Sequence, residues 1–134
     1  MAVIDASIVI AALSPDEQDQ TALTKLAPYF GGGGYVPGLW PIEVANVLLT
    51  KRRRAILSAA DGDAVWHAIA SIPVETCHFG LDRVAADIRP LAARHELTSY
   101  DACYLQLALD RSAPLATVDR KLAAAARAEG LIVL

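Results

Sequence analysis

The sequence predicts an α/β fold in which helices cover both faces of a parallel sheet. Short apolar runs at residues 2–4, 114–116 and 131–134 lack the polar alternation of a half-exposed strand, so they are candidates for buried strands. Longer segments between such runs carry apolar residues three and four positions apart, as amphipathic helices do. Because this alternation is typical of parallel sheets, functional groups are expected beyond the carboxyl ends of the strands.

The pattern gives the order of the elements along the chain. Strands are expected at residues 2–4, 35–36, 73–76, 114–116 and 131–134, and helices at residues 7–13, 16–30, 41–54, 58–71, 81–95, 99–111 and 119–129. The apolar stripe of the second helix is assigned to Leu23, Leu26, Ala27 and Phe30, and that of the fifth helix to positions 81, 84, 85, 88, 91 and 92.

Proline and glycine mark most of the boundaries. Pro15 follows the first helix, and the four glycines at residues 31–34 stop the second helix in a turn. No Lys-Ser or Lys-Thr pair follows these glycines, so a phosphate-binding loop is not indicated. Pro41 suits the first turn of a helix, Pro90 predicts a kink or a break inside the fifth helix, and Gly130 is expected to end the last helix.

The length is that of one domain, assigned to residues 1–134, and no internal repeat or linker indicates a second. With 12 basic and 15 acidic residues, the chain has a formal net charge of −3, unlike most nucleic-acid-binding proteins. Two cysteines are too few for a disulfide framework. No signal peptide and no membrane-spanning run is recognisable, so we expect a cytoplasmic protein without membrane contact.

One basic run, Lys51-Arg52-Arg53-Arg54, stands out against the negative balance. A local basic strip can hold a phosphate backbone whatever the net charge of the protein, so Arg52, Arg53 and Arg54 are candidate contacts to a nucleic-acid backbone. The same residues also suit the C-terminus of a helix, where cations complement the helix dipole. The two roles are compatible, and the sequence leaves both open.

Four acidic residues are expected at one edge of the sheet. Asp5 follows the first strand directly and Asp119 comes just after a later strand, so both emerge at the carboxyl edge. Glu43 and Asp101 lie in the first turns of two helices, each within apolar sequence. Asn46 and Thr50 share a helix face with Glu43, and this narrow polar row suits a pocket wall better than a solvent-exposed face.

Each acid also has a structural explanation. Asp5 and Asp119 can N-cap the helices that they precede. Asp101 stands three residues after Thr98, which is the spacing of a capping box, and Glu43 gains from the dipole at its helix start. These roles do not exclude a shared site, because helix starts at the carboxyl edge point into the same crevice.

Four carboxylates in one crevice repel one another, and burial would neutralise some of them unless a cation joins them. Oxygen ligands without histidine or cysteine favour Mg²⁺ or Mn²⁺ over Zn²⁺. Such an ion polarises a phosphoryl oxygen and activates water for attack. The acids therefore predict a metal-dependent site that acts on phosphate esters.

Four segments spread along the whole chain resemble the motifs of the PIN-domain ribonucleases. They are residues 3–7 (VIDAS), 37–46 (PGLWPIEVAN), 99–102 (SYDA) and 116–119 (ATVD). The resemblance implies a three-layer α/β/α sandwich with a parallel sheet of about five strands. It also implies an endoribonuclease that depends on Mg²⁺ or Mn²⁺. Within the family the segments are similar to those of VapC toxins, which implies the toxin of a type II toxin–antitoxin pair.

The resemblance also assigns residues and partners. The catalytic, metal-binding acids that it implies are Asp5, Glu43, Asp101 and Asp119. The groups that it implies in support of them are Ser7, Thr117 and Asn46. Arg120 and Lys121 stand where some relatives carry a further acid, so the number of metal ions stays open. RNA is the implied substrate, with a small VapB-like antitoxin and a second copy of the chain in a homodimer as further partners. The mechanism that we expect is in-line attack of water on an RNA phosphodiester.

Two other functions fit parts of the pattern. Asp5 could be the nucleophile of an aspartyl phosphohydrolase, but haloacid-dehalogenase-type enzymes carry a second Asp two residues on, where this chain has Ser7. A response-regulator receiver domain would need an acid pair near the first strand, which is absent. A non-catalytic interaction protein with a vestigial pocket is the other alternative, and the intact acids argue against it.

Overall fold

The computed structural model describes residues 1–134 and has a parallel four-stranded sheet at its centre. The strands are β1 (Val3–Ile4), β2 (Gly34–Pro37), β3 (Val74–Cys77) and β4 (Leu115–Ala116), in the order β3-β2-β1-β4. A single parallel bridge between Leu115 and Val133 stands in place of the expected fifth strand at residues 131–134. The predicted parallel α/β class is confirmed, with four strands where about five were expected.

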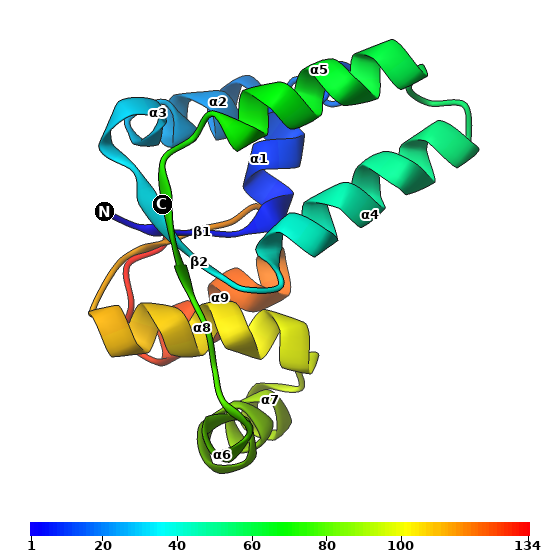
Figure 1. Ribbon diagram of the computed structural model, residues 1–134. Helices are drawn as coiled ribbons and strands as arrows, with labels where there is room; N and C mark the ends of the chain where they lie inside the picture. The colour runs from blue at the N-terminus through cyan, green and yellow to red at the C-terminus, as the bar shows by residue number, and fades with distance from the viewer.

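The helices form a layer on each side of this sheet. They are α1 (Ala6–Leu13), α2 (Gln20–Leu26), α3 (Tyr29–Gly32), α4 (Trp40–Arg53), α5 (Ala59–Ala70), α6 (Leu81–Arg83), the π-helical segment η1 (Val84–Ile88), α7 (Arg89–His95), α8 (Ser99–Arg111) and α9 (Arg120–Ala128). Helices α1, α2, α3 and α5 lie on one side, and α6 to α9 lie on the other (Figure 1). Helices α4 and α5 run side by side as a hairpin that extends beyond the sheet. The three-layer α/β/α arrangement is therefore confirmed.

The core lies between the sheet and the two helix layers. The largest side chains with no exposed surface are Ile4, Ile8, Leu26, Ile88, Leu105, Leu115, Leu122 and Tyr104. Full burial of one such aliphatic side chain contributes roughly 1.5–3 kcal/mol. Both residues of β1 are fully buried because helices cover both of its faces, which explains why the first strand is apolar throughout.

The helix expected at residues 16–30 starts later than predicted. Residues 14–19 form a turn, in which Gln18 adopts the left-handed region with a φ of 35°. The Asp19 carboxylate accepts two backbone N–H groups of the next turn. Because this side chain satisfies donors that a helix start leaves free, α2 begins at Gln20.

The same expected helix is also divided. Pro28, which has no N–H to donate, stands between α2 and α3. Of the predicted apolar stripe, Leu26 is buried and Leu23 is half-buried, whereas Ala27 and Phe30 are exposed. The buried part of the predicted stripe therefore ends at Leu26, and the assignment of Ala27 and Phe30 to this stripe is wrong: Ala27 is the exposed C-cap of α2, and Phe30 lies beyond the break at Pro28.

The glycine run is a turn only in part. Residues 31–32 belong to α3, Gly33 turns the chain with a φ of 75°, and Gly34 begins β2. A Cβ atom at Gly34 would collide with the Ile4 side chain and lie 2.9 Å from the carbonyl oxygen of Ala2. Glycine is therefore needed where β2 approaches β1 closely.

The break predicted at Pro90 takes the form of a π-helical turn. Segment η1 ends just before this proline, whose missing N–H interrupts the α-helical hydrogen bonds. The wider turn shifts the phase of the helix. Ile88 and Leu91 of the predicted stripe are buried, but Leu81 is 88% exposed and Ala85 is exposed, so these two assignments are wrong.

The remaining helices agree closely with the prediction. Ser58 accepts the N–H of Asp61 and caps α5, and Thr98 caps α8 in the same way. Gly130 follows α9 in the left-handed region, with a φ of 82°. None of the helices combines the length and the apolar character that crossing a membrane requires.

Candidate active site

A pocket of about 390 Å³ opens where the strands β1 and β4 end and the helices α4 and α8 begin. Its lining residues are Asp5, Ala6, Ser7, Ile10, Glu17, Glu43, Asn46, Val47, Asp101, Val118 and Asp119. The four acids expected at the carboxyl edge are all among them. Five lining residues are acidic and none is basic, so the pocket concentrates negative charge.

Strand ends and helix starts position the four acids. Asp5 links β1 to α1, and Asp119 stands between β4 and α9. Glu43 lies in the first turn of α4 and Asp101 in the first turn of α8. Because β1 and β4 are parallel neighbours, segments that are far apart in the sequence meet at one edge of the sheet.

Asp5 is the most buried of the acids, with 5% of its surface exposed. Its Oδ2 accepts hydrogen bonds from Ser7 Oγ and Thr117 Oγ1, each at 2.6 Å. These two hydroxyl oxygens in turn accept the backbone N–H groups of Val118, at 3.2 Å, and Asp119, at 3.0 Å. The network ties the end of β1 to the segment that follows β4, and it fixes the orientation of the Asp5 carboxylate.

Glu43 is held by a residue that the sequence analysis missed. Tyr104 Oη donates a hydrogen bond of 2.6 Å to Glu43 Oε1, and the tyrosine is fully buried. Tyr104 lies on α8 three residues after Asp101, on the same side of the helix. One turn of α8 therefore supplies Asp101 to the pocket and also the tyrosine that holds Glu43. The i+3 spacing was the signal available in the sequence.

The expected capping interaction forms at Asp119, forms in half at Asp101, where only the Thr98 side of the capping box is present, and does not form at Asp5. Asp119 Oδ1 accepts the N–H of Leu122 at 2.9 Å, and Thr98 Oγ1 accepts the N–H of Asp101 at 3.1 Å. Asp5 occupies the N-cap position of α1, but its side chain makes no capping hydrogen bond. A capping role is therefore wrong for Asp5, because its carboxylate binds the two hydroxyl groups instead.

The surroundings raise the pKa of three of the acids. Burial is the largest cause of the raised pKa at Asp5, Glu43 and Asp101, because it disfavours the charged form. The charges of neighbouring acids raise each pKa further, whereas the hydroxyl donors lower it at Asp5 and Glu43. A bound cation would oppose both causes, so the pocket favours positive charge.

The donor types in the pocket fit a divalent cation that prefers oxygen. Carboxylate and hydroxyl oxygens line it, histidine and cysteine do not, and such ligands favour Mg²⁺ or Mn²⁺. No three of these side chains are already arranged as a closed set of metal ligands. The pocket therefore offers suitable ligands on its walls rather than a preformed cage.

Glu17 is a further acid in this pocket that the sequence analysis missed. Its Oε2 lies 2.6 Å from Lys51 Nζ, and Asp16 Oδ2 lies 2.5 Å from the same nitrogen. The Lys51 side chain is only 11% exposed. The first residue of the basic run is thus paired with two carboxylates, and no local pattern indicates a contact over such a distance in the sequence.

The other residues predicted to take part lie around the pocket. Asn46 lines it but makes no hydrogen bond with any of the acids. Arg54 lines an adjoining pocket that shares Asn46 and Val47 with the acidic one. Of the predicted RNA contacts, Arg54 is therefore the one placed beside the acids.

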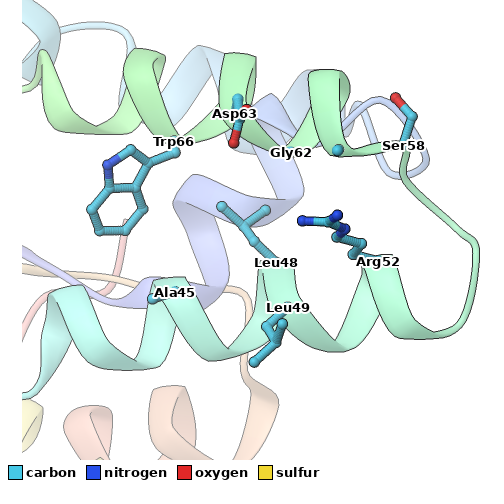
Figure 2. Close-up of a pocket in the computed structure, with 9 residues that line it drawn as sticks. Ala45, Leu48, Leu49, Arg52, Ser58, Gly62, Asp63 and Trp66 are labelled. Atoms are coloured by element: carbon cyan, nitrogen blue, oxygen red, sulfur yellow. The ribbon is translucent and has the colours of Figure 1, made fainter.

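Arg52 and Arg53 lie elsewhere on α4. Arg52 lines a pocket between α4 and α5, together with Leu48, Leu49 and Trp66. Figure 2 shows its guanidinium group directed into the space between these two helices. Arg53 is exposed near the end of α4. The basic run thus points in several directions and does not form one strip.

Comparison with known proteins shows the family of this fold. A family model described as the PIN domain matches residues 2–128. The chain belongs to the PIN-domain family. One relative of this PIN domain is ribonuclease VapC3 of Pyrobaculum aerophilum, which is 30% identical over 125 residues, or 90% of this chain and 91% of the relative.

Solved structures share the fold of this PIN domain. PAE2754 from Pyrobaculum aerophilum superposes with a TM-score of 0.73 at 22% identity, over 98% of this chain and 89% of that chain. FitAcB from Neisseria gonorrhoeae gives a TM-score of 0.63 at 19% identity, over 100% and 96%. The resemblance to PIN domains that four short segments indicated is confirmed over nearly the whole length.

Proposed function

We propose that this PIN domain is an endoribonuclease that requires Mg²⁺ or Mn²⁺ and acts as the toxin of a type II toxin–antitoxin pair. The pocket lined by five acidic and no basic residues carries the proposal. Such a pocket repels phosphate until cations neutralise it, as expected of a metal-dependent phosphodiesterase. The likeness to ribonuclease VapC3 supports RNA as the substrate. The antitoxin partner follows from the resemblance of the four sequence segments to those of VapC toxins.

Asp5, Glu43 and Asp101 would hold the principal ion, and Asp119 would complete the site or orient water. When bound, the ion supplies positive charge to the phosphoryl oxygens and lowers the pKa of water. The acids come from four separate segments of the chain, so folding itself assembles the site. Hydrolysis would proceed by in-line attack of water on the phosphorus atom.

The supporting residues would keep the ligands in place. Ser7 and Thr117 direct one carboxylate oxygen of Asp5 toward the end of β4. Tyr104 fixes one oxygen of Glu43, which leaves the other oxygen without this donor. Such outer contacts orient the residues that bind a metal directly.

The proposal also includes the RNA contacts, the protein partners and the cellular location of this PIN domain. Arg54 would contact the RNA backbone beside the acids, and Arg52 and Arg53 would contact it farther along α4. A VapB-like antitoxin and a second copy of the chain would cover apolar surface that is now exposed, such as Leu49 and Trp66. We further propose that residues 1–134 form a single domain that works in the cytoplasm.

RNA cleavage by single-residue variants tests the proposal. Asp5→Asn and Asp101→Asn each remove one negative charge from the pocket and keep the size of the side chain. Each is expected to lower the cleavage rate by roughly 10²-fold or more, because ion binding and charge stabilisation are lost together. The rate is measured with end-labelled RNA in Mg²⁺, and circular dichroism checks the fold.

Asp82→Asn is the matched control, because Asp82 is exposed and lies outside the acidic pocket. Its cleavage rate is expected to equal that of the unmodified protein. Folded Asp5→Asn and Asp101→Asn proteins that cleave as fast as this control would rule out the assigned site.

A further inference from the structure

A second pocket, of about 290 Å³, adjoins the acidic one and carries the opposite charge. Its lining residues, from α2, α9 and the segments beside them, are Asp19, Thr21, Ala22, Lys25, Thr117, Val118, Asp119, Arg120, Ala123, Arg127, Val133 and Leu134. Lys25, Arg120 and Arg127 contribute three positive charges to it. Thr117 lies at the junction, and Val118 and Asp119 line both pockets, so the two pockets are direct neighbours. We call the second pocket the basic groove.

The three cations of the basic groove are free to bind an anion. Among the 12 lysines and arginines of the chain, Lys51, Arg83, Arg94 and Arg111 form ion pairs with carboxylates. Lys25, Arg120 and Arg127 are not among them, and all three are exposed. None of the three is therefore held in an ion pair with a carboxylate.

The two carboxylates in the groove lining already have partners. Asp19 Oδ1 accepts the N–H groups of Thr21 and Ala22 at the start of α2. Asp119 Oδ1 accepts the N–H of Leu122 at the start of α9, and its residue also belongs to the acidic pocket. Both carboxylates keep their charge, but the three cations outnumber them, so the side chains that line the groove carry an excess of one positive charge.

We propose that the basic groove binds the phosphate backbone of single-stranded RNA on one side of the scissile phosphodiester. The proposal rests on the proposed function, because it needs a phosphate to be held among the acids. An RNA strand that leaves the acidic pocket past Asp119 enters the groove, where Arg120 is the next residue along the chain. Contacts to phosphates position a strand without reading its bases.

The same arrangement explains how a protein with a net charge of −3 can hold a polyanion. The acids repel RNA, and the groove supplies attraction directly beside them. Arg54 lines the pocket that adjoins the acids through Asn46 and Val47, whereas the groove adjoins them through Asp119. A strand that touches both Arg54 and the groove therefore crosses the acidic pocket.

RNA binding at different salt concentrations tests the groove. The triple variant Lys25→Gln/Arg120→Gln/Arg127→Gln is compared with Arg89→Gln, which removes an exposed cation without an ion pair outside both pockets. Both are made in the Asp101→Asn protein so that the RNA stays intact. The probe is a fluorescently labelled single-stranded oligoribonucleotide of mixed sequence, and its anisotropy reports binding.

Each phosphate contact to single-stranded nucleic acid contributes about 0.7 to the slope of log affinity against log salt concentration. The triple variant is therefore expected to show a slope shallower by about 2 and an affinity at least about tenfold weaker at low salt. The Arg89→Gln protein is expected to keep the parent slope and affinity. Thermal unfolding midpoints are expected to agree, because all the changed side chains are exposed.

Two results would contradict the proposal that the basic groove binds RNA. One is an equal slope and affinity in the triple variant and the Arg89→Gln protein. The other is a triple variant that loses binding to labelled polyglutamate while its RNA binding is unchanged, which would assign the groove to an acidic peptide. Cleavage by the unmodified protein is measured in parallel: its absence rejects the proposed function, whereas cleavage with unchanged RNA binding by the triple variant rejects only the groove.

Discussion

At the scale of single residues, the site depends on side chains that hold the acids. A buried carboxylate such as Asp5 is unfavourable to ionise, and hydrogen bonds from Ser7 and Thr117 offset part of this cost. Glu43 receives its hydrogen bond from Tyr104. In the absence of metal, these donors are the groups that stabilise the negative charge of the two acids.

Tyr104→Phe removes the hydroxyl donor of Glu43 and keeps the buried ring. Because Glu43 then loses the contact that fixes one of its oxygens, the apparent affinity for Mg²⁺ is expected to fall by about 10- to 100-fold. The measurement is the Mg²⁺ concentration that gives half-maximal RNA cleavage.

Tyr100→Phe makes the same chemical change one turn earlier on α8, where the side chain is 64% exposed. Its Mg²⁺ requirement is expected to match that of the unmodified protein. If both variants need the same concentration of Mg²⁺, then Tyr104 does not position Glu43 for the metal.

At the scale of elements, the contact between α4 and the turn at residues 14–19 holds one wall of the pocket. Lys51 on α4 binds Asp16 and Glu17 of the turn, and Glu17 lines the pocket. Ser14 donates a further hydrogen bond to Asp16. The contact therefore positions a turn that has no regular structure of its own.

Lys51→Met keeps an apolar stem of similar length and removes the charge that joins Asp16 and Glu17. Because two carboxylates lose a largely buried partner, the free energy of unfolding near neutral pH is expected to fall by about 2 kcal/mol. Urea unfolding of this variant is compared with that of Lys25→Met, whose side chain is exposed and unpaired.

The loss of unfolding free energy in the Lys51→Met variant is expected to depend on pH. Burial raises the pKa of Asp16, but hydrogen bonds from Lys51 and Ser14 outweigh burial and hold the pKa below its ordinary value of 3.8. The contribution to stability is thus complete above this value and disappears as the pH falls through the folded-state pKa. An equal deficit for Lys51→Met at neutral pH and in acid would show that Asp16 does not take part.

Local signals predicted some elements well and failed for others. The helices that begin at Ser99 and Ala59 were predictable, because a Thr or Ser cap and an apolar period mark them. The turn at residues 14–19 was not, because its contact with Lys51 spans 35 positions in the sequence. A pattern read over one window of the chain does not contain such a partner.

The acids of the site were predictable for a related reason. Asp5 and Asp119 follow strands, and parallel strands end at one edge whatever their order. The i+3 spacing from Asp101 places Tyr104 on the pocket side of α8, but its contact with Glu43 depends on which helices pack together, as does the position of Glu17. The hydrogen bond between Tyr104 and Glu43 joins residues 61 positions apart.

At the scale of the whole molecule, acidic and basic side chains line separate pockets that lie next to one another. The acidic pocket lies between the basic groove and the pocket that contains Arg54, and it shares two lining residues with each of them. Neither the net charge nor the basic run of the sequence indicates this arrangement. It arises because α2, α4 and α9 bring residues that are far apart in the sequence to the walls of neighbouring pockets.

The most direct test of the central claim is RNA cleavage by the unmodified protein as a function of divalent metal. Protein freed of metal with EDTA is mixed with end-labelled single-stranded RNA, and Mg²⁺ or Mn²⁺ is then added in excess over the chelator. The acidic pocket predicts no cleavage in EDTA and restored cleavage with either ion, because carboxylates alone repel the phosphate. Full cleavage in excess EDTA, or no cleavage at any concentration of either ion, would contradict it.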